Sequence, residues 1–127
     1  MLPTDTLNAL RADSHPAPVA SIGFSPFLRL LVLAPHPDDF DAIAITLRGF
    51  QAQGNDIHLA VMSGGSKGVQ DSYASPPTRE RKARLREQEQ INSCSFFGLN
   101  PDRLGFLRLP EAPDLSLIHI SEPTRLV

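Results

Sequence analysis

A short apolar segment that ends at a proline is the feature of this 127-residue chain that most restricts its fold. Residues 28–34 have the sequence LRLLVLA, rich in branched side chains, and Pro35 follows them. A run of this length and composition is typical of a buried strand in a parallel sheet, which is covered on both faces. Such sheets place their chemistry at the carboxyl ends of the strands. We therefore expect functional groups directly after this strand.

The sequence His36-Pro37-Asp38-Asp39 lies at that strand end and offers one imidazole and two carboxylates. A neutral imidazole with a carboxylate oxygen suits zinc better than magnesium or calcium. His36 and Asp39 are therefore candidate metal ligands, and Asp38 is a candidate general base for a metal-dependent hydrolase. The alternative is that these carboxylates, with Asp41, only cap the next helix. Capping does not explain why His36 and Pro37 precede them.

Alternating strands and helices are predicted beyond this motif. Ile43, Leu47 and Phe50 share one face of a helix expected over residues 41–53, and Gly54 suits its carboxyl-terminal cap.

Further along the chain, residues 57–62 and 104–109 are predicted strands, and a charged helix over 78–97 lies between them, stopped by Gly98. This order predicts an α/β fold built from right-handed β-α-β units.

The loop after the second strand is a candidate substrate loop, with Ser63, Gly64, Gly65 and Lys67 as its candidate contact residues. It lacks the spacing of a P-loop, so we favour a loop that closes over the site. The alternative function is a non-catalytic α/β binding module that holds a phosphorylated or sugar ligand through Gly64–Gly68.

The charged helix carries Arg84, Glu87, Ile91 and Cys94 at spacings that place them on one face. Because the apolar members should point inward, we expect Arg84 and Glu87 to face the sheet as a brace beneath the metal loop. The alternative is a solvated pair. Cys94 is expected to pack in the core.

Composition narrows the function classes. The chain has a net charge of −2 and one cysteine, so we expect neither a nucleic-acid partner nor a disulfide framework. No signal peptide or membrane-length apolar run is present in the sequence, which favours a cytoplasmic protein and leaves the oligomeric state open. His15, His58 and His119 are poor candidates for a third metal ligand, and His58 suits a half-buried strand position.

Both ends of the sequence differ from its middle. Residues 1–26 contain four prolines and predict a flexible leader or a strap over the domain. Residues 115–127 begin LSLIHISEPTR, which resembles the translation of a transposon-type sequencing adapter. We therefore expect the natural sequence to diverge near Asp114 and the segment 115–127 to be non-native.

The motif Ala34-Pro35-His36-Pro37-Asp38-Asp39 resembles the signature of the LmbE-like (PIG-L) family of zinc-dependent N-deacetylases. The resemblance runs from about residue 28 to residue 110. It implies zinc ligation by His36 and Asp39 and a general-base role for Asp38. The implied substrate is a small N-acylated, commonly N-acetylated, amino sugar or glycoconjugate, whose amide is hydrolysed by zinc-activated water.

The resemblance also implies a fold and indicates that this chain contains only part of it. It implies a Rossmann-like parallel sheet with flanking helices, in which residues 27–114 form the amino-terminal part of a truncated three-layer domain. The helix with Arg84 and Glu87 resembles the Arg-x-x-Glu helix of the family. Phe40 replaces the usual Glu and leaves Asp41 as the nearest carboxylate.

The third zinc ligand of the family is a histidine in the later half of the domain, which this sequence lacks. A three-strand remnant also leaves sheet surface uncovered, so we expect weak zinc binding and almost no activity from this chain alone.

A long read of the source gene across the codon of Asp114 tests this interpretation. We expect the native reading frame to continue for about a hundred residues and to encode the histidine of the later half of the domain. A native frame that stops as written here would contradict it and favour a binding role.

Overall fold

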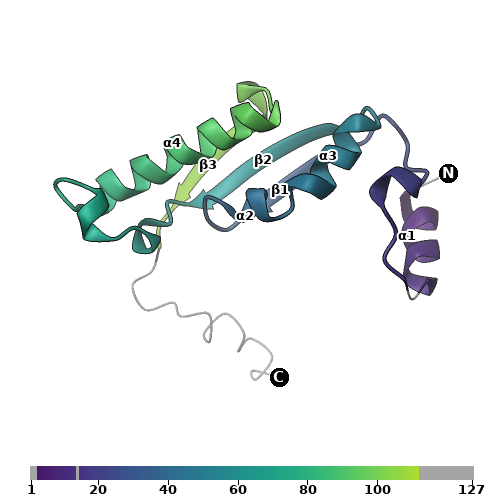
Figure 1. Ribbon diagram of the computed structural model, residues 1–127, viewed down its shortest axis with the longest axis horizontal. Helices are drawn as coiled ribbons and strands as arrows, with labels where there is room; N and C mark the ends of the chain where they lie inside the picture. Colours follow the sequence, from purple (N-terminus) through teal and green to yellow (C-terminus); the bar gives the residue numbers. More distant parts are fainter. Residues whose placement is uncertain (1–2, 14, 112–127) are drawn as a thin grey trace, which may run out of the picture.

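A three-stranded parallel sheet with helices packed on one face forms the body of the molecule (Figure 1). The computed structural model describes residues 3–13 and 15–111. Strands β1 (Arg29–Ala34), β2 (Asp56–Ser63) and β3 (Leu104–Leu109) lie in the order β1-β2-β3, all parallel. The predicted α/β class with a parallel sheet is confirmed.

The helices follow the strands in the order that the sequence predicts, with short turns of 3-10 helix between them. The helical elements are α1 (Pro3–Ala12), η1 (Val19–Ser21), α2 (Asp39–Ala42), α3 (Ala44–Ala52), η2 (Ser66–Gly68), η3 (Asp71–Tyr73), α4 (Arg79–Phe97) and η4 (Pro101–Arg103). No helix among residues 3–13 and 15–111 is both long and apolar enough to cross a membrane.

The helix predicted over residues 41–53 is broken in two. Ile43 leaves helical geometry, with φ −116° and ψ 10°, and separates α2 from α3. Because of this break, Ile43 does not share a buried face with Leu47: Ile43 is 46% exposed and Leu47 is buried. The predicted cap is correct, since Gly54 adopts φ +89° just after α3, a conformation that glycine takes at little cost.

Helix α4 begins and ends where the sequence indicates. The Thr78 hydroxyl accepts a hydrogen bond from the Arg81 amide at 3.3 Å and caps the first turn. Gly98 has φ +88° and its amide donates to the carbonyls of Cys94 and Ser95, which closes the last turn.

The core lies between the sheet and the helices of one face. Ile57, Leu59 and Val61 of β2 are at most 2% exposed. They pack in one cluster with Phe40 from α2 and Phe97 from α4, whose rings meet edge to face at 5.1 Å between centroids. Phe40, the aromatic residue that departs from the motif of the resembled family, therefore anchors α2 to α4.

The opposite face of the sheet is open in the part of the chain that the structure describes. Leu31 and Leu33 on β1 are 63% and 60% exposed, and Leu107 on β3 is 53% exposed. Strands of parallel sheets are ordinarily buried on both faces. The expectation of an uncovered sheet surface is confirmed, and the described residues form two layers of the predicted three.

The amino-terminal segment is partly helical, since α1 occupies residues for which the sequence suggested no regular element. After α1, the segment lies against α3 as a strap. Gln53 Nε2 donates to the Val19 carbonyl at 2.8 Å, and the Phe24 and Phe50 rings lie 5.0 Å apart. The predicted adapter-derived segment 115–127 lies outside the described residues.

We predict that Phe40→Ala lowers the free energy of unfolding by about 3–5 kcal/mol, because it leaves a cavity in the core. Phe96→Ala is the matched control: Phe96 is 95% exposed and its loss should change stability by less than about 0.5 kcal/mol. Urea unfolding measures both. Equal effects of the two substitutions would contradict this packing.

Candidate functional site

The turn between β1 and α2 brings His36 and Asp39 together at the carboxyl edge of the sheet. The His36 amide donates to Asp39 Oδ2 at 2.9 Å, which ties the two residues across the turn. The His36 Nδ1 atom lies 3.7 Å from the same carboxylate oxygen. Both side chains are about half exposed, at 53% and 44%, so each is accessible from solvent.

The donor atoms of this pair suit a zinc ion. Two donors that each lie about 2.0–2.2 Å from one zinc ion are at most about 4.3 Å apart, so the separation of 3.7 Å allows a shared ion. Within residues 3–13 and 15–111, no group of three His, Cys, Asp or Glu side chains could hold a metal. His36 and Asp39 therefore fit two positions of a zinc site and leave the described set one ligand short.

Asp38 has an unusual backbone for a residue with a side chain. It adopts φ +82° and ψ −18° and stands at the amino-terminal cap of α2, but its side chain makes no capping hydrogen bond. This left-handed conformation costs free energy outside glycine. Asp38 therefore does not act as an ordinary helix cap, which was the alternative for this carboxylate.

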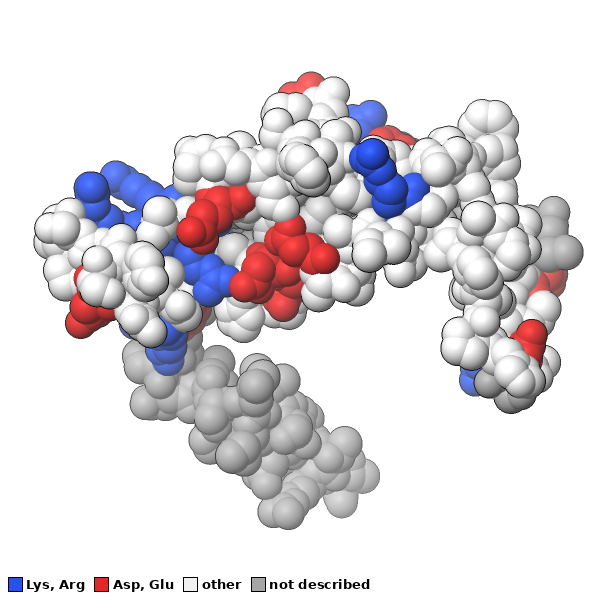
Figure 2. All heavy atoms as spheres, viewed as in Figure 1, with Lys and Arg blue, Asp and Glu red and all other residues white. Residues whose placement is uncertain are grey.

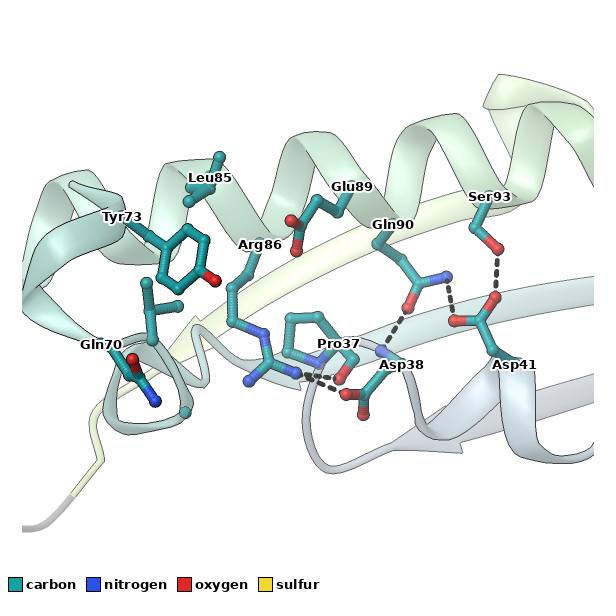
Figure 3. Close-up of a pocket in the computed structure, with 12 residues that line it drawn as sticks. Pro37, Asp38, Asp41, Gln70, Tyr73, Leu85, Arg86, Glu89, Gln90 and Ser93 are labelled. Atoms are coloured by element: carbon teal, nitrogen blue, oxygen red, sulfur yellow. Dashed lines mark hydrogen bonds and ion pairs between the residues drawn. The ribbon is translucent and has the colours of Figure 1, made fainter.

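Two side chains of α4 hold Asp38 (Figure 3). The Asp38 amide donates to Gln90 Oε1 at 2.7 Å, and the Asp38 Oδ2 atom accepts from Arg86 Nη2 at 2.8 Å. The carboxylate itself remains 73% exposed, so Asp38 is held at its backbone amide and at one carboxylate oxygen while most of its side chain stays open to solvent.

Arg86 joins the turn at Asp38 to the loop after β2, residues 64–68, which we call the glycine loop. Its Nη2 atom also donates to the Pro37 carbonyl at 2.7 Å, and its Nη1 atom donates to the Gly65 carbonyl at 3.1 Å. The side chain is only 14% exposed. A planar guanidinium suits this arrangement because its donors point in several fixed directions.

The structure corrects the predicted inward face of α4. Arg84 and Ile91 are exposed, whereas Gln90, Cys94 and Phe97 are buried. The prediction used Ile91 as an inward anchor, and Phe97 with Cys94 would have indicated the correct face.

Glu87 does point inward, as predicted, but its partner is not on α4. Its carboxylate accepts from Arg108 Nε and Nη2 at 2.8 and 3.1 Å. This bidentate contact raises the pKa of Arg108 and coincides with a left-handed backbone there, φ +51°. This contact joins α4 to β3. The expected pairing of Arg84 with Glu87 is not formed: Glu87 pairs with Arg108, and Arg86 is the α4 residue that contacts the turn at Pro37 and Asp38.

Asp41 on α2 forms hydrogen bonds with two polar side chains of α4, Gln90 and Ser93. No signal in the sequence pointed to these partners. Ser93 donates its hydroxyl to Asp41 Oδ1, and Gln90 Nε2 donates to Asp41 Oδ2 at 3.4 Å. Gln90 Nε2 also lies 3.4 Å from Cys94 Sγ. Cys94 is buried as predicted, and burial raises the pKa of its thiol.

The glycines of the loop after β2 have a packing role. A Cβ atom at Gly64 would lie 2.8 Å from the Ala83 Cβ atom, and one at Gly68 would lie 2.3 Å from Arg86 Nη1. Gly65 adopts φ +61°. These glycines let α4 approach the loop closely, which is a reason for their presence that does not involve a ligand.

The polar groups of this loop bind other parts of the chain. The Ser63 hydroxyl donates to the Pro35 carbonyl at 2.8 Å. The Gly65 amide and the Ser66 hydroxyl both donate to Glu111, a residue that sequence reasoning did not single out. Lys67 lies in η2 and is exposed. The role of Ser63, Gly64, Gly65 and Lys67 in binding a substrate remains a prediction.

An open cavity of about 530 Å³ lies beside Asp38, between α2, α4 and the segment after the glycine loop. Its lining includes Asp38, Gln70, Tyr73, Arg86 and Glu89 (Figure 3). In Figure 2, acidic and basic side chains lie next to each other where α2 meets the first half of α4. The volume suits a small molecule, and the lining offers charged groups and one aromatic ring.

His58 lies away from this edge, near the start of β2. Its Nε2 atom is 2.9 Å from Asp56 Oδ2, and Arg103 Nε donates to Asp56 Oδ1 at 2.9 Å. The hydrogen bond with His58, and then that with Arg103, lowers the pKa of Asp56. The half-buried strand position predicted for His58 is confirmed.

We predict that Arg86→Met lowers the free energy of unfolding by about 2–4 kcal/mol, because two carbonyls and a carboxylate lose a charged donor. Arg84→Met, two residues away on the exposed face, should change it by less than about 0.5 kcal/mol. Urea unfolding of both variants measures the difference. A larger effect at Arg84 would contradict the observed face of α4.

Comparison with solved structures finds the same fold in a deacetylase. The N,N'-diacetylchitobiose deacetylase from Pyrococcus horikoshii, solved with its inhibitor MPG, is 18% identical, with a TM-score of 0.59. The match covers 99% of this chain and 46% of that chain, so this protein spans about half the length of that structure. At this identity the likeness shows the fold. No curated protein matches with significance.

A family model identifies the chain more closely. The model described as PIG-L, GlcNAc-PI de-N-acetylase, matches residues 31–122, which include the turn at His36, the glycine loop and α4. The match extends into the segment predicted to be adapter-derived. Because it covers more than half of the chain, this protein belongs to the PIG-L family.

Proposed function

We propose that this chain is the amino-terminal part of a zinc-dependent N-deacetylase that acts on a small N-acetylated amino sugar or glycoconjugate. The observation that carries the proposal is the pairing of His36 with Asp39, beside an open Asp38 carboxylate, at the carboxyl edge of a parallel sheet. Membership of the PIG-L family and the fold of a chitobiose deacetylase support the reaction class.

In this proposal each residue of the turn has a separate task. His36 and Asp39 would hold the zinc ion, which when bound polarises the amide carbonyl and acidifies water. Asp38 Oδ accepts a proton from the attacking water and passes it to the departing amine nitrogen. Arg86 keeps the Asp38 carboxylate beside the cavity that would receive the sugar.

The alternative of a non-catalytic binding module receives less support from the loop contacts. The Gly65 amide and the Ser66 hydroxyl, which a phosphate or sugar ligand would need, donate to Glu111. The glycines at 64 and 68 are explained by the close approach of α4.

The extent of the chain also enters the proposal. We propose that residues 27–114 are the deacetylase segment and that residues 115–127 are adapter-derived. The third ligand then comes from sequence beyond this segment, and the chain alone binds zinc weakly and turns over little substrate.

We predict that His36→Ala weakens zinc binding by this chain by more than about tenfold. Removal of a residue that only hydrogen-bonds a metal ligand already lowers metal affinity by about 10–100-fold. His58→Ala is the matched control, because His58 bonds Asp56 away from the turn. Competition with a zinc-binding dye measures both affinities.

Release of amine from an N-acetylglucosamine compound measures turnover in the same samples. We expect almost none from the zinc-loaded chain. Zinc binding that His36→Ala leaves unchanged would overturn the proposed site, and turnover at an ordinary enzymatic rate would overturn the proposal that the chain is an inactive part.

A further inference from the structure

Gln90 is a buried polar residue to which neither the motif nor the family comparison assigns a role. It is 2% exposed and lies in the middle of α4, among the core residues that face the sheet. Burying a side-chain amide is unfavourable unless both its oxygen and its nitrogen find partners. The partners of Gln90 therefore indicate why a polar residue occupies this position.

Two of its three partners, Asp38 and Asp41, line the cavity of the candidate site. The Gln90 oxygen accepts the Asp38 amide at 2.7 Å, and its nitrogen lies 3.4 Å from Asp41 Oδ2 and from Cys94 Sγ. The bond to Asp38 is the shortest of the three. It joins residues 52 positions apart and reaches the one strained backbone position of the turn, at φ +82°.

The strained backbone at Asp38 needs such a hold. A left-handed conformation at a non-glycine residue persists only where the surroundings fix it. At Asp38 the neighbouring carboxylates diverge: Asp39 accepts from the His36 amide, whereas Asp38 pairs with Arg86 and lines the cavity. A relaxed backbone at Asp38 would lose this separation of the candidate base from the candidate ligand.

We propose that Gln90 is a positioning residue for Asp38: its buried oxygen holds the Asp38 amide, fixes the left-handed turn and so aims the Asp38 carboxylate into the cavity. The functional meaning of this role rests on the proposed function, in which Asp38 is the general base. The hold itself does not depend on turnover, so the two proposals fail separately.

Hydrogen exchange of the Asp38 amide, followed by NMR in the full chain, tests the hold. In the unsubstituted protein this amide should exchange at least about tenfold more slowly than in an unstructured peptide of the same sequence, because it is hydrogen-bonded to a buried acceptor. Exchange at the unprotected rate would overturn the proposal without any variant.

Three variants separate positioning from general stability. Gln90→Met keeps the volume and removes the acceptor, so Asp38 should lose at least about tenfold of its protection. Gln90→Glu keeps an acceptor oxygen but replaces the amide donor beside Asp41 with a second carboxylate, so it should restore only part of the protection that Gln90→Met loses. Gln88→Met is the matched control, since Gln88 is exposed on the same helix and donates to Asn92.

The amide of Leu59 in the central strand reports global unfolding in each variant. A rise in exchange at Asp38 that exceeds the rise at Leu59 supports positioning. Equal rises at Asp38 and Leu59 in Gln90→Met, or loss of Asp38 protection in Gln88→Met, would overturn it and leave Gln90 as a residue of the general packing.

Discussion

The attachment of α4 to the turn after β1 is the interaction on which the candidate site depends. Arg86 holds the Pro37 carbonyl and the Asp38 carboxylate, and Gln90 holds the Asp38 amide from within the core. These are charged or buried hydrogen bonds, for which loss of a partner costs more than the bond itself contributes. The position of α4 and the conformation of the turn are therefore fixed together.

This attachment places demands on the surrounding sequence. The loop after β2 must let α4 approach, which explains the small residues at Gly64 and Gly68. Helix α2 must also be fixed to the core, and Phe40 does this by packing against Phe97 of α4. A carboxylate at position 40 would be buried against this ring. Phe40, which stands where the motif of the family has Glu, therefore suits a core position. The neighbouring carboxylate of Asp41 accepts hydrogen bonds from Gln90 and Ser93.

In the part of the chain that the structure describes, helices cover only one face of the sheet. Leu31, Leu33 and Leu107 present an apolar surface of the kind that a further layer covers in larger α/β domains. The candidate metal pair is incomplete within the same residues. Both observations agree with a chain that spans 46% of the structure it resembles.

Elements whose signals are local could be predicted from the sequence alone. The strands over 29–34, 56–63 and 104–109 follow from short apolar runs, and α4 ends at Gly98 because glycine accepts the left-handed cap there. The nearness of His36 to Asp39 follows from their spacing in one turn. Such features depend on periodicity, chain geometry and backbone preference, which a sequence displays directly.

Only the tertiary structure decided which charged residue of α4 faces the site. Arg84 and Arg86 lie in a stretch rich in Arg and Glu, where an apolar period is absent, and the choice of Arg86 follows from its carbonyl and carboxylate partners on two loops. The left-handed Asp38 and its bond to Gln90 likewise join residues 52 apart. Contacts of this kind depend on how separate elements pack, and packing over such distances leaves no periodic signal in the sequence.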